Sequence, residues 1–133
     1  MKLIFCLDDR CGMMFNGRRQ SQDRILRERI LSMTEGRKLF MSKYSAKQFP
    51  DDAKIKVNDN YQKRAKSEDF CFVEDIPFSL DNVEEIIIYR WNRHYPSDTR
   101  FEIDLAAQGY LLYSTEDFEG SSHDKITEEK YKK

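Results

Sequence analysis

The stretch VEEIIIYRW, residues 83–91, constrains the fold more than any other part of the chain. Its run of isoleucines followed by tyrosine favours a β-strand, because β-branched and aromatic side chains pack well on a pleated surface. We therefore expect a sheet, and we expect the remaining elements to be arranged around this strand.

Shorter segments of strand composition occur on both sides of it, at 2–7, 38–42, 53–57, 70–74, 100–105 and 110–114. One helix is predicted: Ser21 is its expected N-cap, Leu26, Ile30 and Met33 recur at helical spacing, and Gly36 ends it. Residues 10–20 and 58–68 are predicted to be loops. Because strand and helix alternate early and strands run together late, the pattern predicts one α/β domain over residues 1–133 with a mixed sheet.

The closing stretch EDFEGSSHDKITEEKYKK, residues 116–133, is polar but holds an aromatic residue, a glycine and an Ile–Thr pair. We interpret it as part of a hairpin and not as a tail. Residues 111–114 and 126–131 are predicted to pair, with residues 118–122 forming the turn.

Composition excludes several function classes. Lys and Arg number 23 and Asp and Glu 24, so a net charge of -1 does not favour general polyanion binding. The odd set Cys6, Cys11 and Cys71, without a C-x-x-C pair, and only two histidines predict neither disulfides nor a metal site. No apolar run has the length of a membrane span, and no signal peptide is recognisable, so we expect a cytoplasmic protein without membrane contact.

With these elements placed, both ends of the chain resemble a known family. KLIFCLDD, the helix and KLFMSKYSAKQF resemble the first half of dihydrofolate reductases, with Met41 to Ser45 standing where that family has Met-Gly-Arg-x-Thr. EEIIIYRWNRHYPSDTRFEIDL and YLLYSTEDFEGSSHDKITEEKYKK are similar to its late strand and final hairpin. The resemblance implies a dihydrofolate-reductase-like α/β fold: a mixed central sheet flanked by few helices, with an antiparallel C-terminal hairpin.

The family binds its nicotinamide cofactor partly through a Gly-Gly turn between a strand and a helix, where backbone N–H groups approach a pyrophosphate. This chain has five glycines, and none lies between Arg37 and Gln108. The strand, turn and helix expected before EEIIIYRW are missing. We therefore expect a shortened, divergent member without NADPH, and a small-molecule, nucleotide or protein-binding module in preference to an enzyme.

The resemblance implies two candidate sites. Asp23 falls near the acid that binds the amino-pyrimidine edge of the pterin, and a carboxylate accepts such a donor pair well. Asp is also favoured in a first helical turn for structural reasons. Lys43 and Ser45 would flank a phosphate of the cofactor in the family pattern, or are simply polar residues at a strand end.

The residues themselves leave other functions open. Arg18, Arg19, Arg24, Arg27 and Arg29 form the one dense basic cluster, which predicts an anion or RNA site or else a solvated helix face. The alternatives to a binding module are therefore a residual NADPH-dependent pterin reductase and an RNA-binding or ribonuclease-type protein. The sequence places no histidine beside Ser21, Ser42 or Ser45, so it supports no nucleophile–base pair.

The missing strand and helix also bear on assembly. If their loss leaves a sheet edge or an apolar face bare, a second copy of the chain can cover it. We therefore expect a homodimer.

Overall fold

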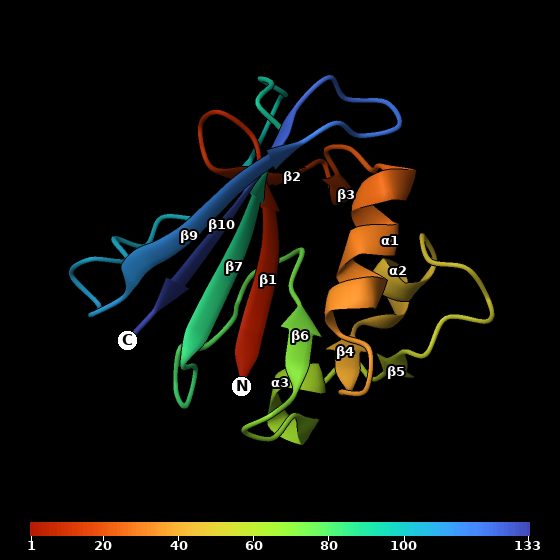
Figure 1. Cartoon of the computed structure of the whole chain (residues 1–133), viewed down its shortest axis with the longest axis vertical. Helices are drawn as coiled ribbons and strands as arrows, with labels where there is room; N and C mark the ends of the chain where they lie inside the picture. Colours follow the sequence, from red (N-terminus) through yellow and green to blue (C-terminus); the bar gives the residue numbers. More distant parts are fainter.

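A seven-stranded sheet forms the centre of the protein in a computed structural model that describes residues 1–133 (Figure 1). Its strand order is β5-β4-β6-β1-β7-β10-β9. The strands are β1 Lys2–Leu7, β4 Leu39–Met41, β5 Lys56–Val57, β6 Phe70–Phe72, β7 Glu85–Arg90, β9 Leu111–Phe118 and β10 Ile126–Lys132. The strands from β5 to β7 in this order run parallel to one another. Strand β10 runs antiparallel to both of its neighbours, β7 and β9. The predicted mixed sheet is confirmed.

The central strands β1 and β7 are buried on both faces. Leu3 pairs with Ile86, and these side chains enter one core cluster. Ile4 pairs with Ile87, and these enter the cluster on the opposite face. Side chains alternate along a strand, so a continuous apolar run can supply two cores at once.

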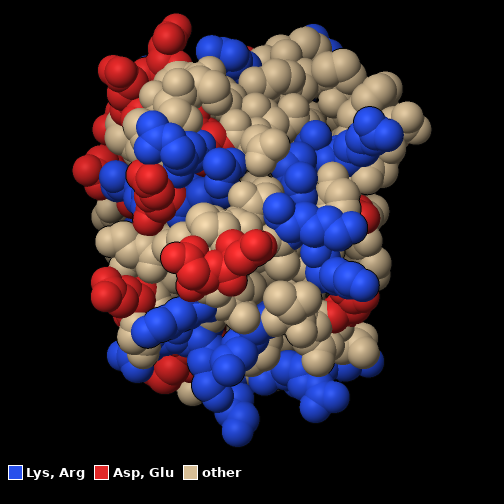
Figure 2. Space-filling model, turned by 90° about the vertical axis from the view of Figure 1, so that its right-hand side faces the viewer, with Lys and Arg blue, Asp and Glu red and all other residues tan.

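One face of the sheet is covered by α1, Arg24–Met33, whose Leu26 and Ile30 are buried. The prediction that Ser21 is the N-cap of this helix is wrong. Asp23 takes that position, because its carboxylate accepts from the backbone N–H groups of Ile25 and Leu26. The outer surface on this side is charged, and Figure 2 shows Lys and Arg side chains with carboxylates among them.

The other face is covered mainly by connections, and the short helix α3, Tyr61–Arg64, contributes Tyr61 to it. The chain runs from β6 to β7 through residues 73–84 with no helix between them, as expected from the missing segment. Phe101, Leu105 and Tyr110 are buried against this face, and the Tyr110 hydroxyl donates to the Val83 carbonyl at 2.6 Å. The predicted strand at 100–105 is therefore wrong: only β8, Thr99–Arg100, is a strand, and the residues after it turn into the core.

Both predicted loops contain regular structure. Residues 10–20 include the hairpin of β2, Gly12–Phe15, and β3, Arg18–Arg19, which form a small sheet with β8. Asn16 and Gly17 have φ of 53° and 72°, the left-handed conformations that a tight hairpin turn requires. The segment 58–68 contains the short helix α3, Tyr61–Arg64, and α2, Lys43–Ala46, follows β4.

The closing hairpin is confirmed. β9 and β10 pair from Leu111 opposite Lys132 to Phe118 opposite Ile126. The first strand is longer than predicted, so the turn consists of residues 119–125. None of the three helices is long and apolar enough to cross a membrane.

A buried carboxylate fastens α1 to this hairpin. Arg29 Nε donates to Glu128 Oε2 at 2.9 Å, and the Tyr89 hydroxyl donates to the same oxygen at 2.8 Å. The guanidinium also contacts the exposed carboxylate of Glu116 at 2.6 Å. Burial raises the pKa of Glu128, but the hydrogen bonds from Arg29 and Tyr89 outweigh it and lower that pKa.

The two carboxylates that share Arg29 give a matched pair of variants. Glu128→Ala should lower the free energy of unfolding in urea by about 3–5 kcal/mol, because it leaves a half-buried guanidinium and a buried phenol without their acceptor. Glu116→Ala should cost about 1 kcal/mol or less, because that side chain is 61% exposed. Equal losses would contradict this account.

Candidate functional site

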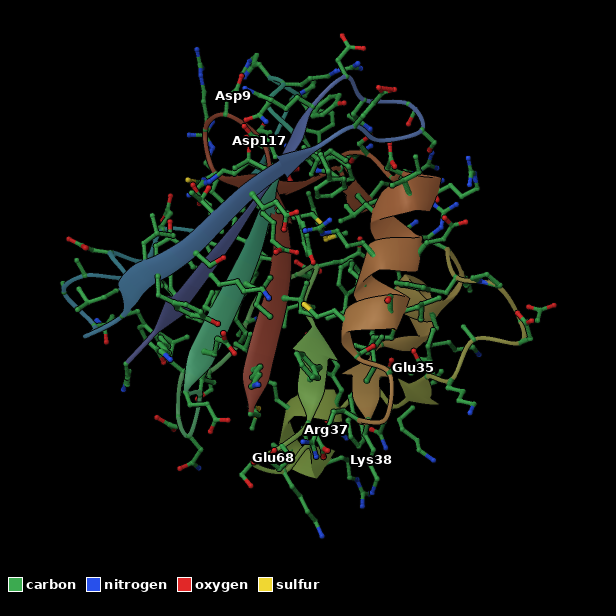
Figure 3. The ribbon with its side chains drawn as sticks, viewed as in Figure 1. Asp9, Glu35, Arg37, Lys38, Glu68 and Asp117 are labelled. Atoms are coloured by element: carbon green, nitrogen blue, oxygen red, sulfur yellow. The ribbon has the colours of Figure 1, made fainter.

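The carboxyl ends of the parallel strands are where ligands bind in open α/β sheets. Several connections gather there: the segment after β1, the β2–β3 hairpin and the turn between β9 and β10 (Figure 1). Figure 3 places Asp9 and Asp117 at this end of the molecule, and Arg37 and Glu68 at the opposite end. Those two form only an exposed ion pair, 3.6 Å apart.

Asp8, at the end of β1, organises this region. Its carboxylate is fully buried and accepts from the N–H groups of Arg10 and Gly12, from the amide of Gln20 and from the N–H of Tyr95. Burial opposes the charge, but these donors lower the pKa of Asp8. One side chain thus fixes three connections relative to the sheet.

A cleft of about 360 Å³, here called the carboxylate cleft, lies between the β2–β3 hairpin, α2 and the segment after β6. Asp59, Glu74 and Asp75 line it, and none of its lining residues is a lysine or arginine. A second hollow, of about 460 Å³, shares Asp59, Tyr61 and Pro77 with it, so the two spaces adjoin.

Glu74 is held firmly at the inner side of the carboxylate cleft. Arg19 donates to both carboxylate oxygens, at 3.0 and 3.2 Å, and the Ser45 hydroxyl donates at 2.7 Å. The amide of Gln48 adds a bond at 3.2 Å. The Arg19 guanidinium also lies over the ring of Tyr44, 4.4 Å from its centre, so this fork is braced on two sides.

This arrangement separates the two residues expected to bind cofactor phosphate. Ser45 is buried in the carboxylate cleft, with its hydroxyl on Glu74 and its N–H on the Ser42 hydroxyl. Lys43 is exposed on α2, and its N–H is bonded by Asp59. Their role toward a phosphate stays a prediction.

Asp23 is enclosed by the turn between β9 and β10. Besides capping α1, its carboxylate accepts from the N–H groups of Ser121 and Ser122 at 3.0 and 2.9 Å, and lies 2.9 Å from Nδ1 of His123. A Cβ on Gly120 would overlap the carboxylate, so the close approach needs glycine. These donors, His123 foremost, hold the pKa of Asp23 well below its usual range although burial raises it. Its role as a pterin anchor stays a prediction. A ligand N–H group would have to displace one of the donors that the protein itself places on the carboxylate.

The basic cluster is divided among different partners. Arg19 and Arg29 are bound to carboxylates of the protein, and Arg24 forms an exposed pair with Glu28 at 3.1 Å. Arg27 donates to Gln22, and Arg18 is exposed on β3. The five arginines therefore do not form one uniform surface.

Sequence reasoning missed Glu74, Asp75 and Asp59. The signal for the first two was present, because carboxylates directly after a buried strand lie at the end of the sheet where ligands bind. No local pattern points to Asp59, which reaches the cleft only because α3 follows β5 at the sheet's edge.

Asp23 should govern part of the acid unfolding of the protein. Its folded pKa lies below its unfolded pKa of about 3.9, so its contribution is complete above about pH 5 and is lost as the pH falls toward the folded value. Asp23→Asn should cost about 1–3 kcal/mol at pH 7, because it leaves buried donors unsatisfied, and should flatten the fall in stability below pH 5. Urea unfolding at several pH values measures both effects. The exposed variant Asp124→Asn should follow the unmodified protein, and an unchanged acid slope in Asp23→Asn would contradict the assignment.

No protein-family model and no curated protein sequence matches the chain. Among solved structures, the dihydrofolate reductase from Enterococcus faecalis, complexed with NADP(H) and RAB-propyl, is similar with a TM-score of 0.68 at 11% sequence identity. The match covers 98% of this chain and 94% of that chain. The protein therefore has the dihydrofolate-reductase-like fold that its two ends predicted.

Proposed function

We propose that this protein is a binding module without reductase activity, and that the carboxylate cleft takes a small ligand carrying positive charge or several N–H donors. The observation that carries the proposal is the lining of the cleft. Three carboxylates face it without a lysine or arginine, and Arg19 neutralises only the inner one.

The same lining argues against a dinucleotide. A pyrophosphate needs N–H donors and cations, whereas Glu74 and Asp75 follow β6 after Val73 with no glycine beside them in the sequence. The one glycine that lines the cleft, Gly17, belongs to the turn between β2 and β3. Two like charges 4 Å apart repel by about 4 kcal/mol at an effective dielectric constant of 20. A penalty of that size would weaken binding about a thousandfold.

An amino-pyrimidine or amidine fits the carboxylate cleft better. Asp59 and Asp75 each use one oxygen on a neighbouring N–H group, of Lys43 and Ile76, and keep the other oxygen free. Each free oxygen can accept an N–H donor of the ligand, and the charge of the carboxylate strengthens such a hydrogen bond. Tyr61 and Pro77 supply apolar surface for a ring.

The alternatives have less support. A residual pterin reductase would need a nicotinamide cofactor at a cleft of the wrong charge. An RNA-binding or ribonuclease-type role would rest on Arg18, Arg24 and Arg27, because Arg19 and Arg29 already bind carboxylates of the protein. The cytoplasmic location stays a prediction, with which three free cysteines agree.

We also infer a homodimer formed along β9. This strand is an edge of the sheet, and Leu111, Leu112 and Tyr113 are 69%, 51% and 48% exposed. The pairing with β10 shifts at Tyr113, which has no partner in the register, and the three exposed side chains lie at this irregular part of the edge. An exposed apolar edge of this kind favours pairing with a second strand.

Thermal melts with separate ligands test the binding function. A ligand at a hundred times its Kd adds about 2.7 kcal/mol, a shift of several degrees for this size of domain. We expect such a shift with 2,4-diaminopyrimidine and none with NADPH. Asp75→Asn should reduce the shift, because it removes one charge from the cleft, and Asp81→Asn, an exposed change away from the cleft, should not.

A shift with NADPH would overturn the proposal, and so would an equal effect of the two Asp variants. Dihydrofolate, measured alongside, separates the sites: a shift that survives Asp75→Asn would place the pterin elsewhere and favour Asp23.

Light scattering during size exclusion tests the dimer. The chain of 15.9 kDa should elute at twice that mass, and Leu112→Lys should return it to the monomer, because a charge at the paired edge opposes association. Ser67→Lys, at an exposed position in the segment before β6 and outside β9, serves as the control for added charge. A monomer at high concentration would contradict the dimer.

A further inference from the structure

His123 lies between two side chains that come from a much earlier part of the sequence. Its Nδ1 lies 2.9 Å from Oδ2 of Asp23, and its Nε2 lies 2.9 Å from the hydroxyl oxygen of Ser21. Carboxylate, imidazole and hydroxyl thus follow one another at hydrogen-bond distance. This is the order of groups that activates a serine for attack on a carbonyl.

The environment fixes the imidazole in the orientation that this chemistry needs. The Asp23 carboxylate is surrounded by donors that favour its charged form, so it accepts a hydrogen bond from Nδ1–H. In the neutral ring that donates Nδ1–H to Asp23, Nε2 carries the lone pair and faces the Ser21 hydroxyl. The ring is stacked on Trp91, with centres 4.5 Å apart and planes at 26°. The side chains of His123 and Asp23 are 2% and 0% exposed, so neither is free to swing away.

Ser21 differs from its two partners because it is only half-buried, and its contact with Tyr95 connects it to a groove at the surface. Its hydroxyl oxygen is 3.5 Å from the hydroxyl of Tyr95. Tyr95 lines a groove of about 420 Å³ together with Phe15, Arg18 and Pro96. The hydroxyl of Tyr95 also lies 3.2 Å from Nε2 of His123, so a second proton donor stands beside the serine.

The groove has a definite chemical character. Phe15 is 47% exposed, which leaves an apolar ring at the surface. Arg18 is exposed and forms no ion pair with a carboxylate of the protein. The backbone N–H groups of Ser21 and Gln22 donate to no acceptor within the protein. Such surroundings suit an ester that combines an apolar part with an anionic part.

We propose that Ser21, His123 and Asp23 form a nucleophilic centre that cleaves small carboxylic esters of this class. The Ser21 hydroxyl gives its proton to Nε2 of His123 as its oxygen bonds to the ester carbonyl carbon. The carbon–oxygen bond to the alcohol then breaks, and the alcohol leaves with the proton from His123. Water attacks the acyl-serine in the same manner, which releases the carboxylic acid and restores the Ser21 hydroxyl.

This centre is separate from the carboxylate cleft and does not rest on the binding function proposed for it. The groove and the carboxylate cleft share no lining residue, and only Arg19, which lines the groove and donates to Glu74, touches both regions. A failure of ligand binding at Asp75 would leave the present proposal standing.

The test uses the purified full chain and a fluorophosphonate probe, which marks activated serines by covalent phosphonylation. We expect one adduct per chain by intact mass, placed on Ser21 by peptide mapping, and hydrolysis of p-nitrophenyl acetate above the buffer rate. Ser21→Ala should abolish the adduct. Ser32→Ala, at an exposed position on α1, should leave both readouts unchanged.

His123→Asn distinguishes a general base from a merely structural residue. It should slow labelling of Ser21 by about a hundredfold or more, the usual contribution of a positioned base. Circular dichroism and an unfolding curve establish whether the His123→Asn variant is folded. If it is not folded, the loss or persistence of the adduct in Ser21→Ala decides whether Ser21 is the nucleophile. No adduct on the unmodified protein, an adduct that persists in Ser21→Ala, or an equal labelling rate in folded His123→Asn would each overturn the proposal.

Discussion

The burial of two carboxylates at one end of the sheet is the constraint on which the rest of this region depends. An ionised carboxylate inside a protein must be surrounded by donors, since an unpaired charge there is very costly. Asp8 obtains its donors from the segments around Gly12, Gln20 and Tyr95, and Asp23 obtains its own from α1 and the last turn. The surface connections are ordered because these charges require it.

The parts of the fold that could be predicted from the sequence are those that depend on neighbouring residues. The isoleucine run of β7, the apolar β1 and the closing hairpin all follow from neighbouring residues. The Asn16–Gly17 turn was equally readable, although the flanking strands are too short to show periodicity. The segment after Arg100 was misread because its apolar residues alternate as in a strand, whereas Phe101 and Leu105 are in fact buried in the core cluster that also contains the side chains of β1.

The candidate sites could not be predicted in this way, because they are made of partners distant in sequence. Arg19 and Glu74 are 55 residues apart, and His123 lies 100 residues from Asp23. Only the parallel order of β4, β6 and β1 brings the first pair together, and only the long C-terminal hairpin brings the second. Asp23 could be singled out in advance, but its neighbours could not. The contact of Asp23 with His123, which the sequence does not indicate, suggests a different role for this carboxylate.

The central place of β1 has a consequence for how the chain acquires its structure. Lys2 pairs with Phe70 on one side and with Glu85 on the other, so β1 is made before either of the strands that it pairs with. Contacts of such long sequence separation slow folding, and an unpaired apolar strand is open to association with other chains meanwhile. During synthesis on the ribosome, KLIFCL therefore stays unpaired until residues 70–90 have been made, and a chaperone that holds extended apolar peptides would protect it in that interval.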